Sequence, residues 1–235
     1  MTENMNAEEI RGIYQKLKDF YGEAPKPDDK SGVEYLVETI LSQNTNDVNR
    51  DKAYQNLQDR YDSWKEVEKG DVDELTETIR VAGLGPTKAN RIQNALRIVR
   101  EETGGKYSLD FIRDMSVEEA KDWLENIPGI GPKTAAIILC FHFKKPVIPV
   151  DTHVHRISKR LGIIPKDASR KKAHKILDEK VPDDIKYGFH RLLITHGREH
   201  CKARNPTCGE GPLAERCIYW QEVVQKGRDE EEVFG

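Results

Sequence analysis

The stretch Ile127–Ala136 reads Ile-Pro-Gly-Ile-Gly-Pro-Lys-Thr-Ala-Ala and is the most informative part of the chain. Two glycines one residue apart permit a tight turn with positive φ, and the proline after them suits the first position of a helix. The residues from Lys133 to about Phe143 are almost wholly apolar, which predicts a buried helix. We therefore expect a hairpin whose backbone N–H groups, exposed near Gly129 and Gly131, form a phosphate site at a helix N-terminus.

A similar pattern occurs once before in the chain. Gly83–Ala89 (Gly-Leu-Gly-Pro-Thr-Lys-Ala) resembles Gly129–Ala135, 46 positions later, and helical patterns flank both segments. Each copy predicts a helix, a hairpin and a second helix. Two copies are too few for a solenoid, and two ordinary helix–helix turns remain the alternative interpretation.

Helical periodicity also dominates the rest of the chain. Apolar residues recur at helical spacing in several segments, which are 10–20, 33–41, 75–81 and 92–99. The β-branched run Val147–Val150 is isolated and is interrupted by a proline, so we expect no real sheet. The sequence therefore predicts an all-α fold.

Two residues are candidates for a catalytic role. Lys133 occupies the first turn of the expected helix, where a cation opposes the helix macrodipole. This position favours the neutral amine that nucleophilic attack or Schiff-base formation requires, although a lysine that only reaches a phosphate or solvent is the alternative. Asp151, eighteen residues further on, precedes a helical pattern and is expected to cap it. A carboxylate held in this way can also stabilise a developing sugar cation or accept a proton from an amine.

The charge of the chain is unevenly distributed. The 235 residues carry a net charge of −3, which alone argues against a nucleic-acid binder. However, the segment 140–205 holds 16 Lys and Arg against 7 Asp and Glu, together with all seven histidines. Because local positive charge sets the field that a polyanion meets, this segment is a candidate nucleic-acid surface. Ordinary solvated helix faces are the alternative, and the acidic run 229–232 is expected to be a solvated tail.

Composition also excludes some classes of protein. No run approaches 18 apolar residues, so we expect no membrane span, and the polar N-terminus lacks the features of a signal peptide. A cytoplasmic protein is therefore expected. Cys201, Cys208 and Cys217 lie within 17 positions, and in a reducing compartment such spacing favours metal or cluster ligation over disulfides. Cys140 is expected to be a plain core cysteine.

Taken together, these motifs resemble the endonuclease III family of helix–hairpin–helix (HhH-GPD) DNA glycosylases. The similarity runs from about residue 30 to residue 220 and includes the segments 41–47, 82–84, 127–135, 150–156 and 195–198. The resemblance implies a two-lobed all-α fold with DNA bound between the lobes. One lobe is a six-helix bundle over 27–143, and the other combines 1–26 with 144–235 and contains the cysteine loop 201–217.

The resemblance further implies a nucleoid-associated enzyme of base-excision DNA repair. It is expected to act as a monomer on double-stranded DNA with a damaged base or an abasic site. The target nucleotide is flipped out of the duplex. In the family, a lysine at the position of Lys133 attacks the deoxyribose C1′, and β-elimination then nicks the strand 3′ to the abasic site. An aspartate at the position of Asp151 assists. A bifunctional DNA N-glycosylase and AP lyase that removes oxidised pyrimidines is thus expected. The alternatives are a non-catalytic helix–hairpin–helix DNA-binding protein and a monofunctional mismatch glycosylase.

The resemblance also suggests contacts with DNA. Leu84 would be the wedge that enters the base stack, with a buried staple in the turn as the alternative. Gln43 or Asn44 would contact the opposite strand or fill the gap left by the flipped base. The full set of expected DNA contacts is Gln43, Asn44, Leu84, Gly129, Gly131, Thr134, Lys202 and Arg204.

The cysteine loop departs from the family pattern Cys-x6-Cys-x2-Cys-x5-Cys, which binds a [4Fe–4S] cluster. Cys201, Cys208 and Cys217 occupy the first, second and fourth positions, but the third is Gly211. Three thiolates are one short of the usual four. The resemblance therefore leaves open a [4Fe–4S] cluster completed by Glu210, His200 or water, a [3Fe–4S] cluster, or loss of the cluster.

Overall fold

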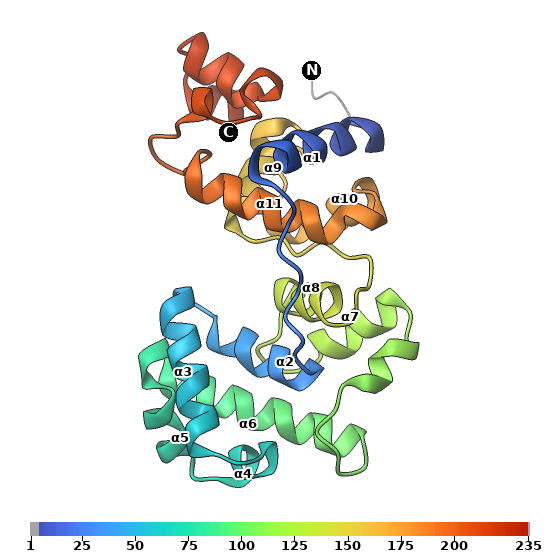
Figure 1. Cartoon of the computed structure of the whole chain (residues 1–235), viewed down its shortest axis with the longest axis vertical. Helices are drawn as coiled ribbons and strands as arrows, with labels where there is room; N and C mark the ends of the chain where they lie inside the picture. Colours follow the sequence, from blue (N-terminus) through green and yellow to red (C-terminus); the bar gives the residue numbers. More distant parts are fainter. Residues whose placement is uncertain (1–4, 235) are drawn as a thin grey trace. The chain divides into compact units, whose positions relative to one another are not determined.

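The computed structural model describes residues 5–234. Our expectation that there is no signal peptide rests partly on residues 1–4, which lie outside this range. Within the described residues the chain is helical and contains no β-strand (Figure 1), which confirms the all-α fold class. None of the helices in this part of the chain combines the length and the apolar character needed to cross a membrane.

The chain forms two compact units, which we call the hairpin unit (28–145) and the cysteine unit (1–27 with 146–235). The α-helices of the hairpin unit are α2 (Gly32–Leu41), α3 (Asp47–Arg60), α4 (Trp64–Lys69), α5 (Val72–Thr78), α6 (Gly85–Glu102), α7 (Val117–Glu125) and α8 (Pro132–Phe141), with 3-10 turns η1 (Arg80–Ala82) and η2 (Asp110–Asp114). There are seven α-helices here, where six were expected. The additional helix arises because α4 ends at Lys69, Gly70 follows as its C-cap, and the side chain of Asp71 then caps α5.

Helix α2 is the centre of the hairpin unit. It packs against α3, α6 and α8, and most of its side chains are buried. Its N-terminus is set by a capping box, in which Ser31 and Glu34 each accept a hydrogen bond from the other's backbone N–H group. The loop that leaves α2 at its C-terminal end therefore starts from a fixed point.

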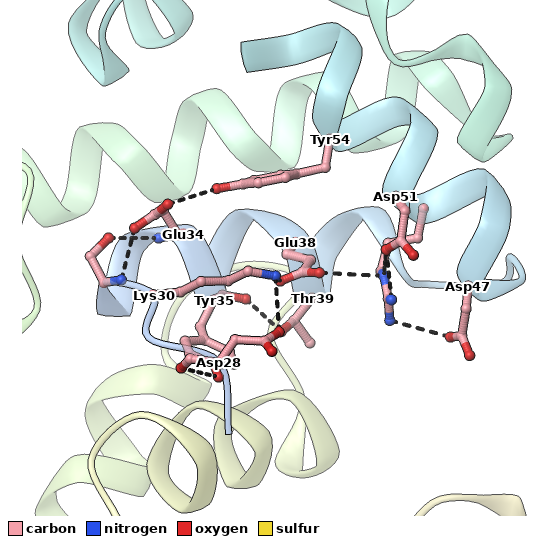
Figure 2. A network of polar contacts seen from close by, with 11 residues as sticks. Asp28, Lys30, Glu34, Tyr35, Glu38, Thr39, Asp47, Asp51 and Tyr54 are labelled. Atoms are coloured by element: carbon pink, nitrogen blue, oxygen red, sulfur yellow. Dashed lines mark hydrogen bonds and ion pairs between the residues drawn. The ribbon is translucent and has the colours of Figure 1, made fainter. Parts of the chain in front are cut away.

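A polar network attaches α3 to α2 (Figure 2). Glu38 on α2 lies 2.9 Å from the amine of Lys30 and 3.5 Å from the guanidinium of Arg50 on α3. The hydroxyl of Tyr54 on α3 donates a hydrogen bond to Glu34 at 3.2 Å. These contacts hold the two helices that flank the loop 42–46, which includes two of the expected DNA-contacting residues.

The cysteine unit is built around the packing of α1 and α9 on α11. Its elements are α1 (Ala7–Tyr21), α9 (Thr152–Leu161), α10 (Arg170–Lys180), η3 (Asp183–Ile185), α11 (Lys186–Glu199), η4 (Cys208–Glu210), η5 (Ala214–Arg216), the π-helix η6 (Trp220–Gln225) and α12 (Glu230–Phe234). One apolar core joins the buried face of α1 to α9, α10 and α11 and extends to the three cysteines of the loop.

The acidic run 229–232 is exposed, as expected for a solvated tail. Residues 230–232 also form the start of the short helix α12. Glu230 lies 3.3 Å from the guanidinium of Arg160 and also accepts a hydrogen bond from the hydroxyl of Tyr219, while Phe234 packs on the Tyr219 ring. This attachment was not predicted, because the buried cation on α9 that attracts Glu230 is distant in the sequence.

Candidate functional site

The second hairpin connects α7 to α8. Gly129 has a φ of 89°, which favours glycine, and Ile130 is buried, which fixes the turn to the core. Gly131 occupies the N-cap position of α8, and Pro132 begins the helix. A glycine N-cap offers no side-chain acceptor, so the first N–H groups of α8 remain available to other partners. The space beside Gly131 is also open, because no atom lies within 4 Å of a Cβ placed there. The geometry therefore suits the expected phosphate site.

Lys133 lies in the first turn of α8, as the sequence predicts, and its side chain is exposed. Its amine makes no hydrogen bond or ion pair with any residue in 5–234. The neighbouring Thr134 is buried, so its side chain faces the core and only its backbone is available near the surface. The helix thus presents one unpartnered amine beside its open N-terminus.

The hairpin is held by a contact that sequence reasoning missed. Arg91 on α6 donates a hydrogen bond to Oε1 of Gln43 at 2.5 Å, and Nε2 of Gln43 donates to the carbonyl of Gly129 at 2.9 Å. The Arg91 stem also fills the space beside Gly129, where a Cβ would lie 2.7 Å from the Arg91 Cδ. The side-chain amide of Gln43 therefore already makes hydrogen bonds within the protein. The adjacent Asn44 is exposed and has a left-handed backbone conformation with a φ of 52°.

The first hairpin presents its apolar residue to solvent. Leu84 has a φ of 54° and is 53% exposed, whereas Ile130 at the equivalent position is 4% exposed. The alternative of a buried staple is therefore wrong for Leu84. The turn is fixed by Lys88, which is fully buried and donates hydrogen bonds at 2.8 Å to the carbonyls of Leu41 and Ala82. Burial lowers the pKa of Lys88, and the charge of Arg91 lowers it further.

Asp151 belongs to the cysteine unit and caps α9. Its Oδ1 accepts a hydrogen bond from the backbone N–H of Val154 at 2.7 Å, which confirms the expected cap. The motif that follows attaches α9 to the end of α11. Arg156 donates to the carbonyls of Gly197 and Cys201, and the His153 ring occupies the space where a side chain on Gly197 would lie. The carboxylate of Asp151 is thereby placed on a rigid element.

The three loop cysteines lie together around one pocket. Cys201, Cys208 and Cys217 line it with Arg160 of α9 and His196 of α11. Nη1 of Arg160 lies 3.4 Å from Sγ of Cys201, and its guanidinium stacks 3.8 Å from the centre of the Tyr219 ring. Sequence analysis missed both Arg160 and His196 as members of this group because they precede the loop and approach it only through the packing of α9 and α11.

Burial determines the protonation of these groups. It raises the pKa of Cys208 and raises that of Cys217 to about 11. It lowers the pKa of His196 to about 4, with a further contribution from the charge of His200. The His196 imidazole is therefore neutral at pH 7. Lys202 and Arg204, the two loop residues expected to contact phosphates, are both exposed.

Comparison with known proteins identifies the family. The model of the HhH-GPD superfamily of base excision DNA repair proteins matches residues 37–183. Endonuclease III of Thermotoga maritima is 36% identical over 186 residues, which cover 79% of this chain and 82% of that protein. A relative from Arabidopsis thaliana is 38% identical over 177 residues, which cover 74% of this chain and 60% of the relative. A solved structure of a trapped covalent intermediate between endonuclease III and DNA has a TM-score of 0.81 and 29% identity, and covers 94% of this chain and 100% of that one.

The chain belongs to the HhH-GPD superfamily and, within it, to the endonuclease III family. The resemblance seen in the motifs is confirmed. Membership of the endonuclease III family makes the chain a DNA glycosylase of base-excision repair, and its likeness to endonuclease III–DNA complexes supports DNA binding.

The endonuclease III family often carries a [4Fe–4S] cluster, so we asked whether these residues fit one. Within residues 5–234 no three His, Cys, Asp or Glu side chains form a group suited to a metal ion. The ligands of a cluster bind separate irons and surround a larger core, and here three thiols line one pocket. A Cβ on Gly211 would lie 3.0 Å from Cε1 of His196, beside the same pocket. Three of the four thiolates that such a cluster uses therefore lie around one pocket, beside the position of the missing fourth.

Proposed function

We propose that the chain is a bifunctional DNA N-glycosylase with AP lyase activity, which removes oxidised pyrimidines and nicks duplex DNA 3′ to the abasic site. The observation that carries the proposal is the unpartnered, exposed amine of Lys133 beside an open helix N-terminus. A protein that only binds DNA does not need a lysine nucleophile. The proposal includes action as a monomer on DNA with a damaged base or an abasic site.

The reaction begins with Lys133. Its Nζ forms a bond to the deoxyribose C1′ while the bond from C1′ to the base breaks, and the departing base takes up a proton. Loss of the second Nζ proton and opening of the sugar ring give an imine. Removal of a proton from C2′ then breaks the C3′–O bond, so that the strand is cut and the phosphate leaves with the downstream fragment.

The other residues position the DNA and assist the reaction. The N–H groups at Gly131 and the start of α8 bind a phosphate near the target nucleotide, and Gly129 lets the backbone approach closely. Leu84 enters the base stack, which its exposure permits. Asp151 assists as a proton acceptor and stabilises positive charge on the sugar as the base leaves.

We also propose that the loop holds an iron–sulfur cluster through Cys201, Cys208 and Cys217. The cluster would cross-link the loop and thereby position Lys202 and Arg204, which are exposed on it, against DNA phosphates. Because both cations are exposed, we propose the same contacts for a loop without a cluster, which would hold the two side chains less firmly. No step of the base-removal reaction passes through the cluster.

Borohydride trapping tests the proposal. The protein is incubated with duplex DNA that contains thymine glycol or an abasic site, and borohydride is added to reduce the imine. We expect a covalent protein–DNA adduct that is absent in Lys133→Ala. Lys65→Ala is the matched control, because Lys65 is also an exposed lysine of the hairpin unit, and it is expected to form the adduct as the unchanged protein does.

The alternatives give different results in the same assay. Binding without an adduct and without base release would show a non-catalytic DNA-binding protein. Base release without an adduct or a strand nick would show a monofunctional glycosylase. Either result overturns the bifunctional assignment.

A further inference from the structure

Position 211 of the cysteine loop faces a histidine ring. The φ of Gly211 is −101°, which any residue adopts, so the backbone does not require glycine there. A Cβ on Gly211 would lie 3.0 Å from Cε1 of His196 and 3.2 Å from Cβ of His200. Contacts this short mean that a longer side chain at position 211 would enter space that these histidines already occupy.

The donors near Gly211 differ in their access to the pocket. Glu210 is exposed on the surface of the loop. Nδ1 of His200 lies 3.2 Å from the hydroxyl of Thr207, and His200 is not among the residues that line the cysteine pocket. His196 is 5% exposed and does line that pocket. The structure therefore favours His196 over the donors that the sequence suggested.

The orientation of His196 leaves one ring nitrogen for a ligand. Its Nδ1 lies 2.9 Å from the hydroxyl of Tyr21, whose oxygen can accept the Nδ1 proton. Nε2 has no hydrogen-bond partner among residues 5–234. Histidines that bind metals usually have their other nitrogen held by such a partner, which fixes the tautomer and the ring orientation.

We propose that His196 is the fourth protein ligand of the iron–sulfur cluster and binds it through Nε2, in place of the cysteine that the family carries at position 211. This inference rests on the cluster that we propose for Cys201, Cys208 and Cys217. The ligand set is then three thiolates and one imidazole, with Tyr21 as the group that positions the imidazole.

The charge around the pocket is consistent with this set. Replacing one thiolate by a neutral imidazole makes the cluster one unit less negative. Arg160 is buried beside Cys201 and supplies a single positive charge at the pocket wall. A buried anion next to a buried cation costs less to desolvate than an unpaired one.

Isotope labelling tests the ligand in the unchanged chain. The full-length protein is produced and purified without oxygen, once with natural histidine and once with 15N-histidine, and is then reduced. We expect absorbance near ~400 nm, about four irons per chain, and a nitrogen hyperfine coupling in pulsed EPR that changes with the label. This measurement does not depend on any variant folding correctly.

Variants provide a second readout. His196→Ala is expected to lose the nitrogen coupling and to fall to about three irons per chain or fewer. His200→Ala is the matched control and is expected to keep both. Because His196→Ala also frees the space beside Gly211, adding Gly211→Cys to it should restore about four irons without any nitrogen coupling.

Three outcomes would overturn the proposal. They are a cluster whose spectrum is insensitive to the histidine label, a His196→Ala protein that keeps both iron content and spectrum, and folded oxygen-free protein without iron. The last outcome would also remove the proposed cluster. Borohydride trapping on the same samples reports on Lys133 separately, so failure of the lyase proposal is distinguished from failure of the ligand.

Discussion

Lys88 and Lys133 show how strongly the environment of a residue depends on packing. Both follow a Gly-x-Gly-Pro turn, and they differ by one position in the two copies of the pattern. Lys88 is fully buried and bonded to two carbonyls, whereas Lys133 is exposed without a partner. One lysine stabilises the first hairpin, and the other is available for chemistry.

The role of Asp151 can be separated from its structural contribution. Asn is as good an N-cap as Asp, so Asp151→Asn should keep the cap on α9 and leave the melting temperature unchanged. The loss of a proton acceptor should lower turnover by about 100-fold, with DNA affinity changing by less than about tenfold. Single-turnover base release and equilibrium DNA binding measure the two effects. Unchanged turnover would contradict the assigned role.

Local rules predicted some site residues and missed others. The places of Lys133 and Asp151 at helix starts follow from the residues beside them, and so does the glycine turn. Arg91 and His196 were missed because their partners are far away in the sequence. Arg91 meets Gln43 across 48 positions, and His196 meets Tyr21 across 175. No spacing rule encodes contacts of this range.

At the scale of elements, the two hairpins share a backbone pattern but present it differently. Leu84 points its apolar side chain into solvent, and Ile130 buries its own. Both hairpins were predicted from the sequence, and the resemblance suggested an exposed Leu84. Local rules alone do not distinguish the two turns, because both residues are aliphatic and both turns contain the same glycines.

A substitution in the hairpin before α8 should weaken DNA binding without lowering the stability of the protein. Gly131→Asp introduces a favourable N-cap with no atom within 4 Å of its Cβ, so the melting temperature should stay unchanged or rise slightly. The added carboxylate should repel the phosphate and weaken DNA binding by about tenfold, or ~1.4 kcal/mol.

Gly129→Ala should have the opposite effect on stability. The alanine would have to adopt a positive φ, and its Cβ would lie 2.7 Å from the Arg91 side chain. It should lower the free energy of unfolding by about 2 kcal/mol. Thermal melts and fluorescence anisotropy with duplex DNA measure both variants. Full DNA affinity in Gly131→Asp would exclude the phosphate site.

The contact between α4 and α6 predicts acid sensitivity. Burial alone would raise the pKa of Glu68, but hydrogen bonds from Arg100, Lys69 and Tyr107 lower it to about 2. Because the folded pKa lies below the ordinary value of 4.5, this stabilisation is complete above pH 4.5 and is lost as the pH falls towards 2.

Glu68→Gln tests this contact. The variant should be less stable than the unchanged protein by about 2 kcal/mol at pH 7, and the difference should shrink below pH ~4.5. Urea denaturation at pH 7 and at pH ~3 measures it. A difference that does not depend on pH would show that the ion pairs of Glu68 contribute nothing through its charge.

At the scale of the whole molecule, the net charge conceals the basic segment. The acidic total of −3 coexists with an excess of positive charge over residues 140–205, which includes the first residues of the cysteine loop, with Lys202 and Arg204. Only charges close to phosphates release counterions, so DNA affinity should fall steeply with salt despite the acidic composition.

Two loop residues make the salt dependence quantitative. The double variant Lys202→Ala with Arg204→Ala removes two proposed phosphate contacts. It should reduce the slope of log affinity against log salt by about 1.8, since each contact contributes about 0.9. Binding titrations over a range of salt concentrations measure the slope, with Lys65→Ala as the control. An unchanged slope would place this loop away from DNA.

The packing of His153 against Gly197 has a consequence for how this sequence can evolve. A glycine within a helix such as α11 costs about 1 kcal/mol relative to alanine, so drift would tend to replace it. Here the ring of His153 fills the space of the missing side chain, so a substitution at either position changes the effect of one at the other. The two positions form an epistatic pair: alanine at 197 becomes acceptable only in a lineage that has first exchanged the histidine at 153. Homologues should therefore carry a residue other than glycine at 197 only where position 153 is no longer histidine.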